Sequence, residues 1–157
     1  FQINNISGPA LRIYPQNQTA NTNDIIDVYL YFDDVPSEKA VTGIHVDIVI
    51  NTTELAFITD SFEQGQLVTQ LSGLTLWPDP RYSEDGHTMS IDGAVYADTN
   101  GIFGTGSIAK FSLRVLAGSG TVNINIASDG EYLDMENNPI VFQNPYGGMV
   151  TVKGAVQ

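Results

Sequence analysis

The chain has 157 residues, 42% of them apolar, and its 18 acidic against 6 basic side chains give a net charge of −12. This length suits one domain spanning residues 1–157, because a single core of about 150 residues buries roughly 70% of the surface that the unfolded chain exposes. The negative charge disfavours nucleic acid and anionic membrane surfaces as partners. The chain lacks cysteine, which excludes disulfides and thiol chemistry, and no apolar run approaches the ~20 residues that cross a bilayer.

Short alternating or apolar runs, separated by Gly, Asn, Asp or Pro clusters, predict β-strands along the whole chain. These runs span Ala10–Tyr14, Ile25–Phe32, Gly43–Ile50, Leu55–Ile58, Leu74–Trp77, Thr88–Tyr96, Gly106–Val115, Thr121–Ala127, Pro139–Phe142 and Gly148–Val152. Helical periodicity is nearly absent, and residues 61–71 allow at most one helical turn because Gly65 lies near their middle. So many strands in one domain predict an all-β fold of two packed sheets.

Alternation with a period of two indicates which side of a strand faces the core. In the third run the predicted core side comprises Ile44, Val46, Ile48 and Ile50. The opposite side comprises Gly43, His45, Asp47 and Val49. In the run from Thr88, one side comprises Met89, Ile91, Gly93 and Val95, and the other Ser90, Asp92, Ala94 and Tyr96. In the run that ends at Val115, the predicted wet side comprises Ile108, Lys110, Ser112 and Arg114.

Residues suited to catalysis are few. The two histidines, His45 and His87, lie on an exposed strand face and beside a turn, and no Gly-x-Ser-x-Gly elbow occurs. No pair of carboxylates stands out among the acids as a glycosidase pair. We therefore expect no enzymatic activity and no cofactor.

Two segments carry oxygen ligands that could hold a structural calcium. Asp98 and Asn100 resemble part of a calcium loop, but the glycine spacing and the distal glutamate of an EF-hand are missing, which favours an Asx turn. An acidic cluster, for which a solvated loop is favoured, comprises Asp129, Glu131, Asp134 and Glu136. We expect no metal site in the module itself.

The chain's one tryptophan, Trp77, lies in the sequence Leu-Trp-Pro-Asp-Pro. Its neighbouring prolines argue against a central strand. Two interpretations remain open: Trp77 is an exposed anchor for a partner, or it covers one end of the core.

Four segments resemble the cohesin modules of cellulosomal scaffoldins. They are Ile26-Asp-Val-Tyr-Leu-Tyr-Phe-Asp-Asp-Val-Pro-Ser, Val41-Thr-Gly-Ile-His-Val-Asp-Ile-Val-Ile-Asn-Thr-Thr-Glu-Leu, Gly106-Ser-Ile-Ala-Lys-Phe-Ser-Leu-Arg-Val and Gly147-Gly-Met-Val-Thr-Val. The resemblance implies a jelly-roll sandwich of about nine strands, which binds a calcium-loaded dockerin module, the calcium being held by the dockerin.

The resemblance also implies a partner site on one flat sheet face. Carried over position by position, its residues are Gly43, His45, Asp47, Trp77, Asp79, Ala94, Tyr96 and Asp98. Gly43 and His45 stand where the family often has Asn and Asp, which indicates a divergent or non-cellulosomal cohesin.

The sequence therefore predicts a non-catalytic, extracellular or cell-surface module that docks a dockerin-bearing protein. Glycosylation sequons at Asn5, Asn17 and Asn51 give weak support to an exterior location. The alternative is a carbohydrate-binding module of β-sandwich fold with a polysaccharide ligand. A sugar site usually has several coplanar aromatic rings in a row, whereas this sequence has a single tryptophan.

Overall fold

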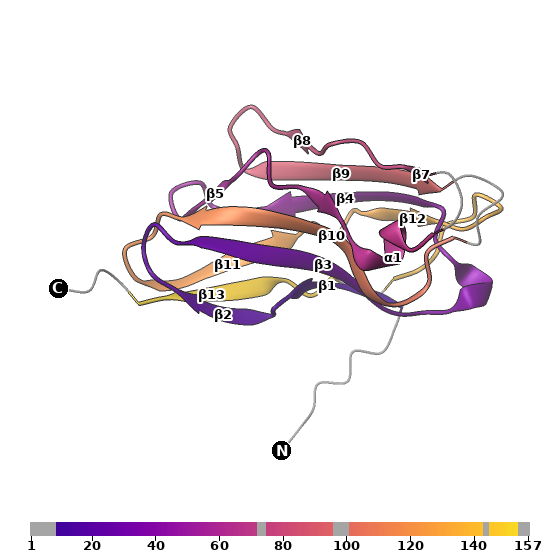
Figure 1. Ribbon diagram of the computed structural model, residues 1–157, viewed down its shortest axis with the longest axis horizontal. Coiled ribbons are helices and arrows are strands. Elements are labelled where there is room, and N and C mark those ends of the chain that lie inside the picture. Colours follow the sequence, from indigo (N-terminus) through magenta and orange to yellow (C-terminus); the bar gives the residue numbers. More distant parts are fainter. Residues whose placement is uncertain (1–8, 72–74, 96–100, 143–144, 154–157) are drawn as a thin grey trace, which may run out of the picture.

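A computed structural model of the chain describes residues 9–71, 75–95, 101–142 and 145–153, which form two packed β-sheets (Figure 1). The first sheet has the order β1–β3–β10–β5, with β6 paired to β10. Its strands are β1 (Ala10–Tyr14), β3 (Ile25–Val35), β5 (Leu55–Phe57), β6 (Glu63–Gln64) and β10 (Gly104–Val115).

The second sheet has the order β2–β13–β11–β4–β9–β7, with β12 paired to β4 and β8 paired to β9. Its strands are β2 (Asn17–Ala20), β4 (Gly43–Val49), β7 (Thr75–Leu76), β8 (Arg81–Tyr82), β9 (Thr88–Val95), β11 (Gly120–Ile126), β12 (Glu131–Leu133) and β13 (Gly148–Val152). Two short helices are η1 (Ser37–Lys39) and α1 (Gln66–Thr69). The pairing of β2 with β13 is parallel, and all other strand pairs named above are antiparallel.

The apolar sides of the two sheets meet in one core. Its largest fully buried side chains are Phe32, Phe111, Leu11, Ile13, Leu30, Ile48, Leu55, Met89, Ile91, Ile102, Ile108 and Leu113. The alternation predicted for β4 is confirmed, because Ile44, Val46 and Ile48 are buried while His45 and Asp47 are partly exposed. The predicted sandwich of two sheets is therefore confirmed, and in the described ranges no helix is long and apolar enough to cross a membrane.

The strand predictions fail for short edge elements. No run in the sequence predicted β2, β6, β8 or β12, which have two to four residues each and little apolar alternation. The expected strand Pro139–Phe142 is wrong, since Pro139 makes only an isolated bridge with Leu133 there. Backbone pairing to a neighbouring strand, rather than a hydrophobic pattern, creates such edges.

The prediction that Ile108 lies on the wet side of its strand is also wrong. The pairing of β10 with β3 shifts register between Ser107 and Ala109, so Ile108 is an extra residue at a β-bulge. Both Ile108 and Ala109 are fully buried. The segment leading into α1 lies over this bulge, and a Cβ at Gly65 would overlap the backbone of Ser107 and Ile108. The glycine at this position therefore allows β6 and α1 to lie close against β10. α1 is a single helical turn, within the limit of one turn predicted for residues 61–71.

Two aspartate substitutions on adjacent residues of β4 test which side of this strand faces the core. We expect Ile48→Asp to prevent stable folding, because the new carboxylate replaces a fully buried side chain without any partner. Val49→Asp should leave the protein folded, because Val49 lies on the other side of the strand and is partly exposed. Circular dichroism melts of both variants check this, and equal loss of stability in the two would contradict the assigned faces.

Candidate functional site

The outer face of the second sheet brings together side chains from β4, β7, β9 and β12. In the register of β4 with β9, Gly43 lies opposite Ala94, His45 opposite Asp92, and Asp47 opposite Ser90. On the other side of β4, β12 places Glu131 beside His45 and Leu133 beside Gly43. β7 adds Leu76 beside Ala94. Successive rows across these strands therefore have different chemistry, one apolar and the next charged.

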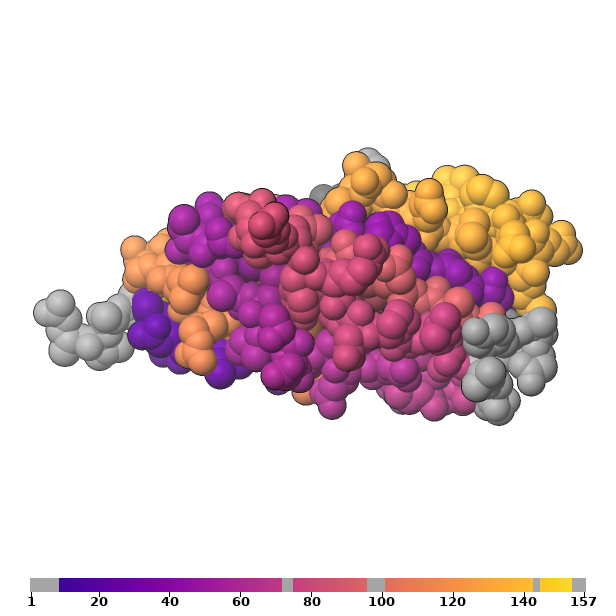
Figure 2. All heavy atoms as spheres, turned by 90° about the horizontal axis from the view of Figure 1, so that it is seen from above, coloured from indigo at the N-terminus to yellow at the C-terminus, as the bar shows by residue number. Residues whose placement is uncertain are grey.

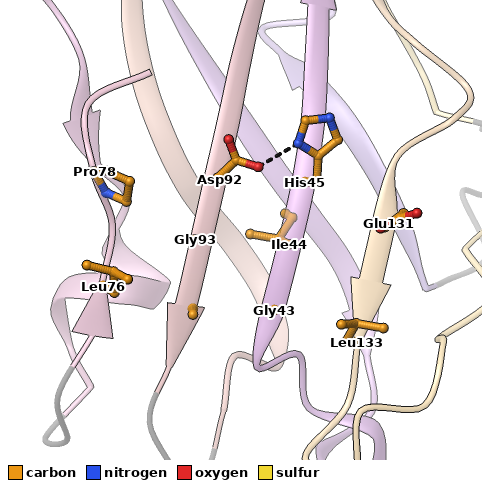
Figure 3. Close-up of a pocket in the computed structure, with 10 residues that line it drawn as sticks. Gly43, Ile44, His45, Leu76, Pro78, Asp92, Gly93, Glu131 and Leu133 are labelled. Atoms are coloured by element: carbon orange, nitrogen blue, oxygen red, sulfur yellow. Dashed lines mark hydrogen bonds and ion pairs between the residues drawn. The ribbon is translucent and has the colours of Figure 1, made fainter. Parts of the chain in front are cut away.

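The charged row is joined by short polar contacts. The His45 ring nitrogen Nδ1 lies 2.6 Å from Oδ1 of Asp92, the contact drawn as a dashed line in Figure 3. Nη2 of Arg81 donates to the other oxygen of Asp92 at 2.9 Å. The second ring nitrogen of His45 lies 3.4 Å from Oδ1 of Asp47. The hydroxyl of Ser90 donates to that same oxygen at 2.6 Å. The five side chains form one network, and each has its orientation restricted by another.

This network shifts the pKa values of His45 and Asp92. The contact with Asp92 raises the pKa of His45 above its ordinary value of 6.5, and the charge of Asp47 acts in the same direction, while burial opposes both. Burial by itself would raise the pKa of Asp92, but its hydrogen bonds with His45 and Arg81 outweigh burial and lower that pKa. The histidine and the two carboxylates therefore stabilise one another most when His45 is protonated.

The apolar row surrounds an open hollow of about 310 Å³ (Figure 3). Leu76 and Pro78 border it on one side and Leu133 on the other, and the strands β4 and β9 form its floor. The hollow exists because Gly43, in the middle of the row, has no side chain; a Cβ there would meet only Leu133, at 3.5 Å. Leu76 is 53% exposed, so an apolar residue stands at the rim.

A second hollow of about 400 Å³ adjoins the first and shares Gly43, Ala94 and Leu133 with it. Met135, 57% exposed, lies at its edge. Figure 2 shows a yellow patch at one end of the molecule, formed by part of the chain between β12 and β13, and this is the end at which β12 is drawn in Figure 1. Leu76 and Met135 thus place exposed apolar groups next to the charged network.

The structure corrects the assignment of Trp77 to an exposed binding face. Trp77 is only 8% exposed and belongs to the core. Its indole occupies the inner side of β9 at Gly93, where a Cβ would overlap the six-membered ring. Leu76 points outward and Trp77 inward, because alternation continues past β7. The sequence left two interpretations of Trp77 open, and the structure favours the one in which Trp77 covers the core.

The other predicted residues divide into three groups. The structure brings Gly43, His45, Asp47 and Ala94 onto one face, as expected. Asp79 is exposed but is not among the residues that line the hollow. Tyr96 and Asp98 lie outside the described residues. The partner-binding role of each remains a prediction.

Sequence reasoning missed several members of this face. They are Leu76, Pro78, Arg81, Asp92, Glu131 and Leu133. Alternation had placed Asp92 on a wet side, but only the β4–β9 register reveals that it contacts His45. Leu133 could not be found, because β12 has no recognisable strand pattern.

The candidate calcium ligands do not converge in the part of the chain that the structure describes, where no group of three or more His, Cys, Asp or Glu side chains could hold a metal ion. The Asp134 carboxylate instead accepts hydrogen bonds from the backbone N–H groups of Glu136 and Asn138, both at 2.9 Å, which closes a loop. The alternative ligands Asp98 and Asn100 lie outside the described residues.

Comparisons with known proteins gave matches among solved structures only. No family model and no curated protein sequence matches the chain. A non-cellulosomal cohesin from the hyperthermophilic archaeon Archaeoglobus fulgidus has a TM-score of 0.67 at 16% identity, over 91% of this chain and 89% of that one. A type I cohesin from Clostridium thermocellum, solved with a dockerin, has a TM-score of 0.73 at 14% identity, over 96% and 98% of the two chains.

The sixth cohesin of scaffoldin B from Acetivibrio cellulolyticus, solved with a mutant Cel5 dockerin, also has a TM-score of 0.73, at 15% identity over 94% of this chain and 100% of that one. At such low identity the matches establish the fold. The chain has a cohesin-like fold, and the resemblance predicted from its sequence is confirmed at that level.

The raised pKa of His45 gives a pH prediction. Because the folded-state value lies above 6.5, the stabilisation from protonated His45 is fully present below pH 6.5 and is lost as pH rises through the folded-state pKa. We expect an NMR titration of the His45 ring to give a value above 6.5 in the native protein and a lower one in Asp92→Asn. A wild-type value at or below 6.5, or one that Asp92→Asn does not change, would refute the assigned contact.

The burial of Trp77 gives a stability prediction. Trp77→Ala should lower the free energy of unfolding by about 3–5 kcal/mol, because it leaves a cavity over Gly93. Trp77→Phe should cost much less, because it keeps a ring there and removes a buried indole N–H that has no hydrogen-bond partner among the described residues. Urea denaturation measures both, and an Ala variant as stable as the native protein would show that Trp77 does not support the core.

Proposed function

We propose that this chain is a non-catalytic docking module that binds a calcium-loaded dockerin through the outer face of β4, β7, β9 and β12. The observation that carries the proposal is the division of this face into an apolar row around a hollow at Gly43 and a charged network centred on His45. Protein interfaces combine an apolar centre with a polar rim in this way. The cohesin-like fold, shared with modules solved in complex with dockerins, supports the same partner.

The shape of the face suits a protein side chain better than a small polar ligand. The hollow at Gly43 is open, and the apolar residues that border it are Leu76, Pro78 and Leu133. An apolar side chain of the partner entering there would bury these groups, which is how a few residues come to dominate an interface.

Charge favours a partner with basic groups. The chain carries a net charge of −12, and the exposed carboxylate of Glu131 lines the hollow beside His45. Complementary charge at the rim of an interface accelerates association and selects among partners. Lysine or arginine side chains of the dockerin are therefore expected beside the hollow, with an apolar residue inside it.

The polar network does not have the geometry of a hydrolase. A serine nucleophile must hydrogen-bond to a histidine that removes its proton, but the Ser90 hydroxyl donates to Asp47 instead. His45 contacts two carboxylates, Asp47 and Asp92, and so holds the face in shape. This arrangement supports a binding role without catalysis.

We extend the proposal to an extracellular or cell-surface setting. Its support is the resemblance to scaffoldin modules and the three glycosylation sequons, at Asn5, Asn17 and Asn51. The carbohydrate-binding alternative draws no support from this face, because the residues that line its hollow include no aromatic side chain.

Filling the hollow tests the proposal. Gly43→Phe should weaken dockerin binding at least about thirtyfold, since the new ring occupies the space meant for the partner. The fold should tolerate it, because a Cβ at Gly43 meets only ordinary contacts. The measurement is isothermal titration calorimetry against a panel of calcium-loaded dockerins that includes the partners of the two complexes above, repeated with EDTA.

Gly118→Phe is a matched control, since Gly118 is exposed in the connection between β10 and β11 and a Cβ there has nothing within 4 Å. This variant should bind as the native protein does. Failure of every dockerin to bind the native module at submillimolar concentration would refute the choice of partner. Equal binding by Gly43→Phe and the native protein would refute the choice of face.

A further inference from the structure

We propose that the opposite sheet carries a second site, for a neutral oligosaccharide, in the hollow between β1, β3 and the segment that joins β6 to α1. This hollow has a volume of about 460 Å³. It lies on the outer face of the first sheet, whereas the partner face belongs to the second sheet (Figure 1). The two sites can therefore be occupied at the same time.

Three tyrosines form one wall. Tyr14 of β1 lies opposite Tyr29 of β3, and Tyr31 follows two residues later on the same side of that strand. The rings of Tyr14 and Tyr31 stack with centroids 4.9 Å apart, and Tyr29 meets each of them edge to face at 6.4 Å. Tyr14 is 43% exposed, and Tyr29 and Tyr31 are partly exposed. A cluster of aromatic rings that is rigid and partly exposed to solvent can stack against the apolar C–H face of a sugar ring.

The facing wall supplies hydrogen-bonding groups. Glu63, Gln64 and Gln66 line the hollow with exposed side chains, and Ser107 is also among its lining residues. Their backbone is fixed, because β6 pairs with β10 and the N–H of Gln66 donates to the Ser107 hydroxyl at 2.9 Å. Carboxylate and amide groups placed opposite aromatic rings are able to bind the hydroxyl groups of a sugar whose ring stacks on the tyrosines.

The charges in the hollow decide between classes of ligand. Lys110 lies 5.9 Å from the Tyr29 ring centroid, with Nζ 3.4 Å from Glu63 and 3.9 Å from Asp27. Asp27 and Glu63 raise the pKa of Lys110, so its charge is retained and already paired. Anionic glycans and phosphates would meet this carboxylate-rich surface of an acidic chain and be repelled.

A cationic ligand is disfavoured for the opposite reason. The Arg12 guanidinium lies 5.2 Å from the Tyr31 centroid and 5.5 Å from the Tyr14 centroid, and Asp33 holds it through a 2.6 Å contact. A bound ammonium group over these rings would therefore lie close to Arg12 and Lys110, whose positive charges repel it. A neutral polyol remains as the ligand chemistry that fits both walls.

Affinity electrophoresis tests the proposal. The gels contain neutral polysaccharides, including cellulose derivatives, xylans, mannans and β-glucans. For any polymer that retards the protein, calorimetry then measures the binding of its oligosaccharides. We expect at least one neutral polymer to bind. Tyr14→Ala should weaken that binding at least about tenfold, since it removes the most exposed ring of the wall. Phe103→Ala is the matched control, because Phe103 is 42% exposed and is not among the residues that line the hollow.

Further variants keep the result interpretable. Tyr14→Phe should retain most of the binding, because it keeps the ring, and Gln66→Ala should weaken binding without a change in melting temperature, because its side chain is exposed. Gly43→Phe, on the other sheet, should bind sugar normally, so the outcome is independent of dockerin docking. Absence of binding to every neutral polymer, binding to acidic polymers only, or equal losses in Tyr14→Ala and Phe103→Ala would overturn the proposal.

Discussion

The antiparallel register of β4 against β9, from Gly43 opposite Ala94 to Val49 opposite Thr88, is the constraint on which the rest of the structure depends. A shift of one residue would reverse the faces of one strand relative to the other, and would place polar side chains such as Asp92 opposite the buried ones of β4. The same register places Asp92 beside His45, and the pairing of β7 with β9 next to it brings the indole of Trp77 to Gly93. Core packing, the polar network and the hollow at Gly43 thus share one cause.

The sequence predicted the long strands well, because their alternation is fixed by burial on one side. The run from Ala10 and the run from Gly148 match β1 and β13 to the residue, and those of β4 and β9 begin where expected. It failed for β2, β6, β8 and β12, which are short and have little apolar alternation, and where a bulge adds a residue, as at Ile108. No local pattern records either event, since both depend on a neighbouring strand.

For the site, sequence reasoning found only part of the face. The outward residues of β4 followed from period two, but their partners, among them Asp92 and Leu133, depend on long-range pairing. The prolines after Trp77 suggested an exposed aromatic residue, whereas the residue one position earlier, Leu76, is the one that points outward. The tyrosine wall was equally hidden, because Tyr14 meets Tyr29 and Tyr31 only when β1 pairs with β3.

The parallel pairing of β2 with β13 has a consequence for the order of folding. Met149 lies beside Asn17 and Val152 beside Ala20, so the edge of the second sheet joins the first part of the chain to the last. Closing so long a loop costs entropy before any contact repays it, and topologies dominated by distant pairings fold slowly. During synthesis β2 must remain without this partner until β13 has left the ribosome. A newly made chain therefore carries an unpaired strand edge from the emergence of β2 until that of β13, and chaperones that cover such edges would act on it during that interval.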